Sequence, residues 1–256
     1  MTPPVDLTSV FGAEAATFFL VFARIGGLFV LAPVFASRMV PMRIRLALGL
    51  GLSFVAMPHA TKGVALDPFA LAPLLLKELL LGTALAFSAA GVYAAIQLAG
   101  SLIDTTIGFS LANVVDPTLN FQSTVTAQIY GLLGSMVFLG SGAHLILVRG
   151  LVLSFDTIPV TAMPNVRSLS GLALHAVAPL FLIGLQIASP IVATLFVTDI
   201  AFGLLARLVP QLQPMAIQFS VKIVVGLGAL VVSLPFTLQL MGDQFTSALA
   251  RGGFTP

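Results

Sequence analysis

The side chains that could carry chemistry are few, and they do not converge along the sequence. Three histidines stand far apart, without the short spacing of metal ligands (His59, His144 and His175). The chain has two glutamates and no cysteine, so neither a paired-glutamate hydrolase nor a thiolate metal site is indicated. No P-loop, G-x-S-x-G or H-E-x-x-H motif occurs. These residues predict no enzyme activity, no cofactor and no metal site.

The longest polar region runs from about residue 101 to residue 128, and apolar residues are interspersed in it. Gly108 and the step from Asp116 to Pro117 favour irregular backbone, because the residue before a proline avoids the helical conformation. The sequence therefore predicts that residues 108–120 interrupt the helices. A loop of this length is usually functional or disordered, and its apolar residues argue against disorder.

Four charged residues lie within or beside apolar stretches: Arg24, Glu78, Asp104 and Arg149. A charge in an apolar setting usually needs a partner, so we expect these side chains to form structural ion pairs or hydrogen bonds. A role in proton coupling is the alternative interpretation.

A fifth and a sixth charge, Asp199 and Lys222, flank a turn signal that contains Pro210 and Pro214. Two apolar helices folded about such a turn form an antiparallel hairpin. The midpoint between the two residues, 210.5, falls at this turn, which would place them at similar height on facing helices. The sequence therefore predicts an ion pair between Asp199 and Lys222.

Composition points to a membrane protein. Hydrophobic residues make up 58% of the chain and charged residues 8%, and the mean hydropathy is +1.10. Soluble domains carry about 25% charged residues, so lipid or apolar protein must cover this chain. Six apolar stretches are visible, at about residues 15–35, 46–57, 74–98, 125–153, 172–209 and 223–241. Their prolines and glycines indicate helices packed mainly against protein.

The formal net charge of +2 gives no support for nucleic-acid binding. One local basic cluster does stand out, formed by Arg38, Arg43 and Arg45. It either contacts anionic headgroups of membrane lipids or anchors a loop between two helices.

An ordered set of short motifs covers nearly the whole chain. The motifs are Arg24-Ile-Gly-Gly with Ala32-Pro33, Pro41-Met-Arg-Ile-Arg45, Lys77-Glu78 with Gly82, Gln97 to Asp104, Gly108-Phe109-Ser110, Asp116-Pro117, Gly142-Ala-His144, Gly203 to Gln211, and Lys222. In this order they resemble the FliR family of flagellar type III export-gate proteins, whose injectisome counterpart is called SctT. Gln213 and Ser220 depart from the family pattern.

The resemblance implies an all-α fold of membrane helical hairpins with broken helices. It also implies a FliP-like part over about residues 1–190 and a FliQ-like hairpin and tail over about residues 191–256. Such proteins assemble with FliP-type, FliQ-type and FlhB-type subunits in the inner membrane, at the flagellar basal body. Unfolded flagellar proteins pass through the assembly.

The polar region would then be a plug in the pore. The plug residues implied by the resemblance are Gly108, Phe109, Ser110, Asp116, Pro117, Asn120 and Phe121. Arg207 joins the structural charges named above. An ordinary loop at the membrane surface is the alternative interpretation of this segment.

Three other functions stay open from the residues. The chain could be the corresponding injectisome subunit. Intramembrane charges and broken helices also occur in small-solute transporters, although no related halves are visible here. An intramembrane enzyme would need candidate catalytic residues that the sequence does not offer.

Overall fold

The computed structural model describes residues 7–37, 40–60, 68–109, 125–162, 179–209 and 214–251. All regular structure in these ranges is helical, which confirms the expected all-α class. Four described helices are long and apolar enough to cross a membrane, or five spans result if the pair α5 and α6 counts as one broken span. Six stretches were expected. The second of them forms a helix of only 15 residues, too short for a span.

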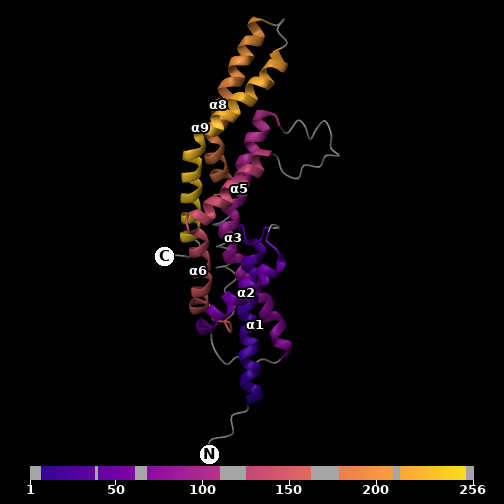
Figure 1. The fold of residues 1–256 in the computed structure, drawn as a ribbon, viewed down its shortest axis with the longest axis vertical. Coiled ribbons are helices and arrows are strands. Elements are labelled where there is room, and N and C mark those ends of the chain that lie inside the picture. Colours follow the sequence, from indigo (N-terminus) through magenta and orange to yellow (C-terminus); the bar gives the residue numbers. More distant parts are fainter. Residues whose placement is uncertain are drawn as a thin grey trace, which may run out of the picture. The chain divides into compact units, whose positions relative to one another are not determined.

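The chain divides into two compact units. The first contains α1 (Leu7–Leu31), α2 (Met42–Ala56), the 3-10 turn η1 (Met57–His59), the first part of α3 (Pro68–Ile107) and α6 (Ala143–Thr157). The second contains α3 from Val92 onward, α5 (Val125–Gly140), α8 (Leu180–Leu208) and α9 (Pro214–Arg251) as far as Thr246 (Figure 1).

Prolines mark the beginnings of four helices. Pro41 and Pro179 precede α2 and α8, and Pro68 and Pro214 are the first residues of α3 and α9. Proline suits these positions because its ring fixes φ and the first helical N–H groups have no intrahelical partner. The fourth apolar stretch divides at Gly142, whose φ of 74° is left-handed, so α5 and α6 are separate helices.

A proline inside α8 shows how the fold satisfies backbone groups in apolar surroundings. Pro190 cannot donate to the carbonyl of Gln186, four residues earlier. The hydroxyl of Ser189 donates to that carbonyl instead, at 2.9 Å. The carbonyl that the proline frees is thus satisfied within the same helix.

Glycines set the closest helix contacts in the first unit. A Cβ atom on Gly82 of α3 would lie 1.8 Å from the carbonyl oxygen of Arg24, and one on Gly27 of α1 would lie 2.5 Å from the backbone nitrogen of Thr83. The two helices therefore touch backbone to backbone. This contact brings Arg24 beside the turn of α3 that carries Glu78.

The second unit uses the same device. A Cβ atom on Gly100 would lie 2.5 Å from the Cα atom of Ala127, which places α3 directly against the start of α5. A Cβ atom on Gly226 of α9 would lie 2.9 Å from the side chain of Ile107. These contacts hold the end of α3 between α5 and α9.

Candidate functional site

Asp104 joins the last turn of α3 to the first turn of α5. Its side chain is fully buried. Oδ2 accepts hydrogen bonds from the backbone N–H groups of Thr126, at 2.9 Å, and Ala127, at 3.3 Å. Oδ1 accepts a third bond from the hydroxyl of Thr126, at 2.6 Å. The carboxylate thus satisfies N–H groups that α5 leaves unpaired at its start, and its negative charge suits a helix N-terminus.

Gly108 ends α3 immediately after this turn. Its φ of 104° is left-handed, and the N–H groups of Gly108 and Phe109 both donate to the carbonyl oxygen of Asp104, each at 3.0 Å. Glycine tolerates this conformation, which closes many helix C-termini. The predicted helix break at Gly108 is confirmed.

The two ends of the chain that flank the predicted plug are held together. One residue, Asp104, binds the chain on both sides of residues 110–124 through its carbonyl and its carboxylate. Most of the residues expected in the plug lie outside the described residues: Ser110, Asp116, Pro117, Asn120 and Phe121. Their part in a plug stays a prediction.

A second polar cluster is buried in the first unit around Arg24. Its Nε lies 2.5 Å from Oε2 of Glu78, and both side chains are fully buried. Nη1 donates to the hydroxyl oxygen of Ser154, at 3.1 Å, and Nη2 donates to the carbonyl oxygen of Ile158, at 2.8 Å. The guanidinium carbon lies 4.1 Å from the ring centre of Phe155. An arginine can be buried this way because every side of its planar group meets a partner.

Lys77 extends this cluster. Its Nζ lies 2.9 Å from Oε1 of Glu78 and donates to the carbonyl oxygens of Val160, at 2.6 Å, and Ala162, at 2.9 Å. Two cations from α1 and α3 therefore bind three backbone carbonyls at or just after the end of α6. The geometry is that of an anchor, since each cation has protein acceptors on several sides. It favours the structural interpretation of Arg24 and Glu78.

The hairpin of α8 and α9 contains the expected ion pair. Nζ of Lys222 lies 2.7 Å from Oδ1 of Asp199, and the side-chain amide of Gln218 donates to the same oxygen, at 2.8 Å. Gln218 was not anticipated, although it precedes Lys222 by one helical turn and shares its face. The side chain of Lys222 is 17% exposed and that of Asp199 is 40% exposed, so the pair is only partly buried.

Two expected structural charges behave differently. Arg149 lies on the exposed face of α6 and Arg207 on exposed α8, and neither makes an ion pair or hydrogen bond within the described ranges. The partner expected for Arg149 is therefore not seen there. Sequence reasoning missed a contact between His59 and exposed Asp156, in which Nδ1 of the imidazole lies 3.2 Å from Oδ2 of the carboxylate. In the part of the chain that the structure describes, no three His, Asp or Glu side chains gather as metal ligands.

Comparison with known proteins decides the family. The model of the family described as bacterial export proteins, family 1, matches residues 15–248. The chain belongs to this family. The expected membership is thereby confirmed.

Several curated members of the family resemble the chain over most of its length. The flagellar biosynthetic protein FliR of Bacillus subtilis is 34% identical over 90% of each chain. The protein of the same name from Escherichia coli is 33% identical over 87% of this chain and 86% of its own. The surface presentation of antigens protein SpaR of Shigella flexneri is 26% identical over 58% of this chain and 57% of its own.

Proposed function

We propose that the chain is a structural, non-catalytic subunit of the flagellar type III protein-export gate and forms part of the pore for unfolded flagellar proteins. The observation that carries this proposal is the match of the export family over residues 15–248, together with flagellar relatives that align over 86–90% of each chain. Four of the described helices are long and apolar enough to cross a membrane, and the gate would lie in the bacterial inner membrane at the flagellar basal body.

Residues 108–122 would form the plug of this pore. Support comes from the Asp104 contacts, which hold both sides of the segment at one point, and from the helix end at Gly108. Non-helical backbone at membrane depth is tolerated only inside protein or beside a water-filled cavity. A segment whose two ends are held at one point, and whose sequence favours turns over helix, suits the lumen of a protein-conducting pore.

FliP-type, FliQ-type and FlhB-type subunits would surround the chain. The N-terminal part to about residue 190 would take the place of a FliP-type subunit, and the remainder that of a FliQ-type hairpin. Support comes from the exposed apolar faces of α8 and α9, which include Phe196, Val231, Val232 and Phe236. Such faces need lipid or a protein neighbour to cover them.

Two measurements test the proposal together. Deleting the gene from its own bacterium should abolish swimming and the secretion of flagellar proteins, and the wild-type gene should restore both. Affinity purification of the tagged full chain from that bacterium should recover FliP-type and FliQ-type proteins in a defined complex. A motile deletion strain, or a chain that purifies alone and moves small solutes in vesicles, would overturn the gate assignment.

The injectisome role is the second candidate, and the similarity to SpaR is the observation that favours it. The same deletion strain distinguishes the flagellar role from the injectisome role. Loss of swimming with intact delivery of other secreted proteins supports the flagellar role. The reverse pattern supports the injectisome role.

A further inference from the structure

A cavity of about 370 Å³ lies between α1 and α2 in the first unit. Four residues of α1 line one wall at helical spacing: Phe22, Gly26, Phe29 and Val30. The recurrence at i, i+4, i+7 and i+8 places them on one face of the helix. Val30 is exposed, so the cavity reaches the surface of the unit there.

The facing wall comes from α2 and has one charged member. Met42, Arg45, Leu46 and Gly49 recur at i, i+3, i+4 and i+7, again on one face. Met42 and Leu46 are exposed at the rim, whereas Gly49 is buried at the floor. None of the residues lining the cavity is acidic, so Arg45 gives an otherwise apolar cavity a positive charge.

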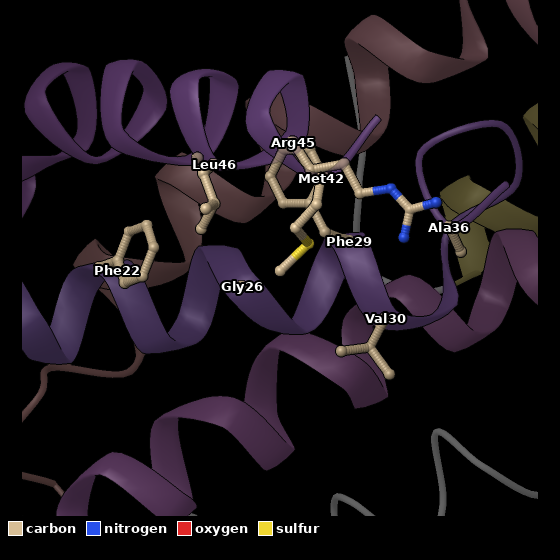
Figure 2. A pocket seen from close by; sticks show the side chains of 9 residues that line it. Phe22, Gly26, Phe29, Val30, Ala36, Met42, Arg45 and Leu46 are labelled. Carbon is tan, nitrogen blue, oxygen red and sulfur yellow. The ribbon is translucent and has the colours of Figure 1, made fainter. Parts of the chain in front are cut away.

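The guanidinium of Arg45 is only partly satisfied. Nη2 donates to the carbonyl oxygen of Ser37 in the turn between the helices. Nε is buried, and no hydrogen-bond acceptor meets it in the described part of the chain. Figure 2 shows the side chain reaching from α2 toward Ala36, which lines the cavity at the same turn. A buried donor without an acceptor is costly, so an anion at this point would be stabilised.

The turn that closes this end of the cavity is strained. Val34 has a φ of 67°, which a β-branched residue rarely adopts, and the N–H of Phe35 donates to the carbonyl oxygen of Pro33 across it, at 2.8 Å. Backbone strain of this kind gathers at ligand clamps and functional sites. Arg45 and the ring contact of Phe35 with Phe29 hold the turn in place.

We propose that this cavity binds one anionic phospholipid, with its phosphate on Arg45 and an acyl chain between Phe22, Phe29 and Leu46. Charge complementarity selects an anion, and the apolar walls select a hydrocarbon chain attached to it. A whole helix does not fit inside the cavity, since a helix with its side chains is about 10–12 Å across. The cube root of the cavity volume is only about 7 Å.

The surroundings of the cavity also suit a lipid. α2 is too short to span a membrane, carries Arg43 and Arg45 in its first turn, and exposes Phe54 and Val55 at its far end. Basic residues at one end of an apolar helix sit at the level of lipid headgroups. The inference concerns the α1–α2 hairpin alone and does not depend on the export function.

The test uses the full-length chain, purified with its co-expressed neighbours, and measures lipid binding by native mass spectrometry and thermal stabilisation. The probes are phosphatidylglycerol, phosphatidylcholine and soluble glycerol phosphate. We expect phosphatidylglycerol to bind about tenfold more tightly than phosphatidylcholine, because the choline cation of phosphatidylcholine offsets the negative charge of the phosphate that Arg45 would face. Equal binding of the two lipids would overturn the proposal. Full competition by glycerol phosphate would also overturn it, in favour of a soluble phosphate site.

Three variants locate the site. Arg45→Gln should remove the preference for phosphatidylglycerol, whereas Arg43→Gln, which removes an exposed charge outside the cavity, should keep it. Equal losses in both variants would mean diffuse surface attraction and no site. Gly26→Leu should weaken both lipids, because a Cβ there meets nothing within 4 Å and the longer side chain would fill the cavity.

If Arg45→Gln fails to fold after losing its bond to Ser37, Gly26→Leu still tests whether the lipid binds in the cavity. The variant keeps Arg45 and replaces a helical glycine by a better helix former, so it should fold. Unchanged lipid binding in folded Gly26→Leu would place the lipid elsewhere and overturn the proposal.

Discussion

The carboxylate of Asp104 at the end of α3 accepts two hydrogen bonds from Thr126 at the start of α5. The hydroxyl donates one at 2.6 Å, and the backbone N–H donates the other at 2.9 Å. Asp104→Asn would keep the size of the side chain but remove its negative charge and replace one of its two acceptor oxygens with an NH2 donor. We expect a loss of about 1–3 kcal/mol in the free energy of unfolding of the second unit. Thermal melting of the purified gate complex measures it. Thr105→Val is the matched control, because that exposed hydroxyl bonds only to its own helix; an equal loss there would contradict the role of Asp104.

Removing the proposed plug should open the pore. Deletion of residues 108–120 should leave Asp104 and Thr126 in place and make membranes that contain the assembled gate leaky to ions and small molecules. Conductance of reconstituted gates, with and without the deletion, measures this. Unchanged permeability in a correctly assembled deletion gate would count against the plug and leave an ordinary loop.

The buried Arg24 cluster should be strongly coupled. Arg24→Met leaves Glu78 buried without its arginine partner, and removing one member of a buried pair costs about 3–5 kcal/mol. Combining it with Glu78→Gln should recover part of this loss, although Lys77 then loses its own ion-pair partner. Protease resistance of the complex measures these changes in stability. Arg149→Met removes the same charge from an exposed face and should change stability by less than about 0.5 kcal/mol.

Close backbone contact between α1 and α3 makes Gly82 sensitive to a single methyl group. Gly82→Ala would place Cβ against the carbonyl of Arg24, and overpacking of this kind costs about 1–3 kcal/mol. Gly51→Ala in α2 meets nothing within 4 Å and should be neutral or slightly stabilising. Comparing accumulation and melting of the two variants checks the contact. Similar behaviour of both would show that the helices do not touch here.

Lys222→Met should weaken the α8–α9 hairpin, and adding Asp199→Asn should restore part of the loss. Because water reaches Asp199, we expect a coupling of up to about 1 kcal/mol, well below that of a buried pair. A double-mutant cycle on assembly yield measures it, with exposed Arg207→Met as the control. Simple additivity of Lys222→Met and Asp199→Asn would rule out the pinning role.

The sequence allowed the hairpin pair to be predicted because a proline-bounded turn sets the register of two long helices. It identified Arg24 and Glu78 as charges that need partners, but it did not show that they are partners of each other. Their meeting depends on the crossing of Gly27 and Gly82, which no local pattern reveals. The other acceptors of Arg24 and Lys77 are a hydroxyl and backbone carbonyls, which carry no charge signal along the chain.

Arg149 shows what hydropathy leaves open. It stands in an apolar stretch, yet the buried side of α6 is formed by Ala143, Leu147, Leu151 and Ser154. Arg149 lies two residues after Leu147 and two before Leu151, so its side chain points to the opposite side of the helix. The break at Gly142 creates this short helix, and hydropathy alone does not show which face of it is covered.

The contacts of Arg24 and Lys77 also constrain how the newly made chain enters the bilayer. Arg24 emerges from the ribosome 54 residues before Glu78 and 134 residues before the carbonyl of Ile158. Until those groups arrive, α1 carries an uncompensated cation that is costly in lipid. We therefore expect α1 to reach its full stability in the hydrocarbon only after α3 and then α6 have been synthesised.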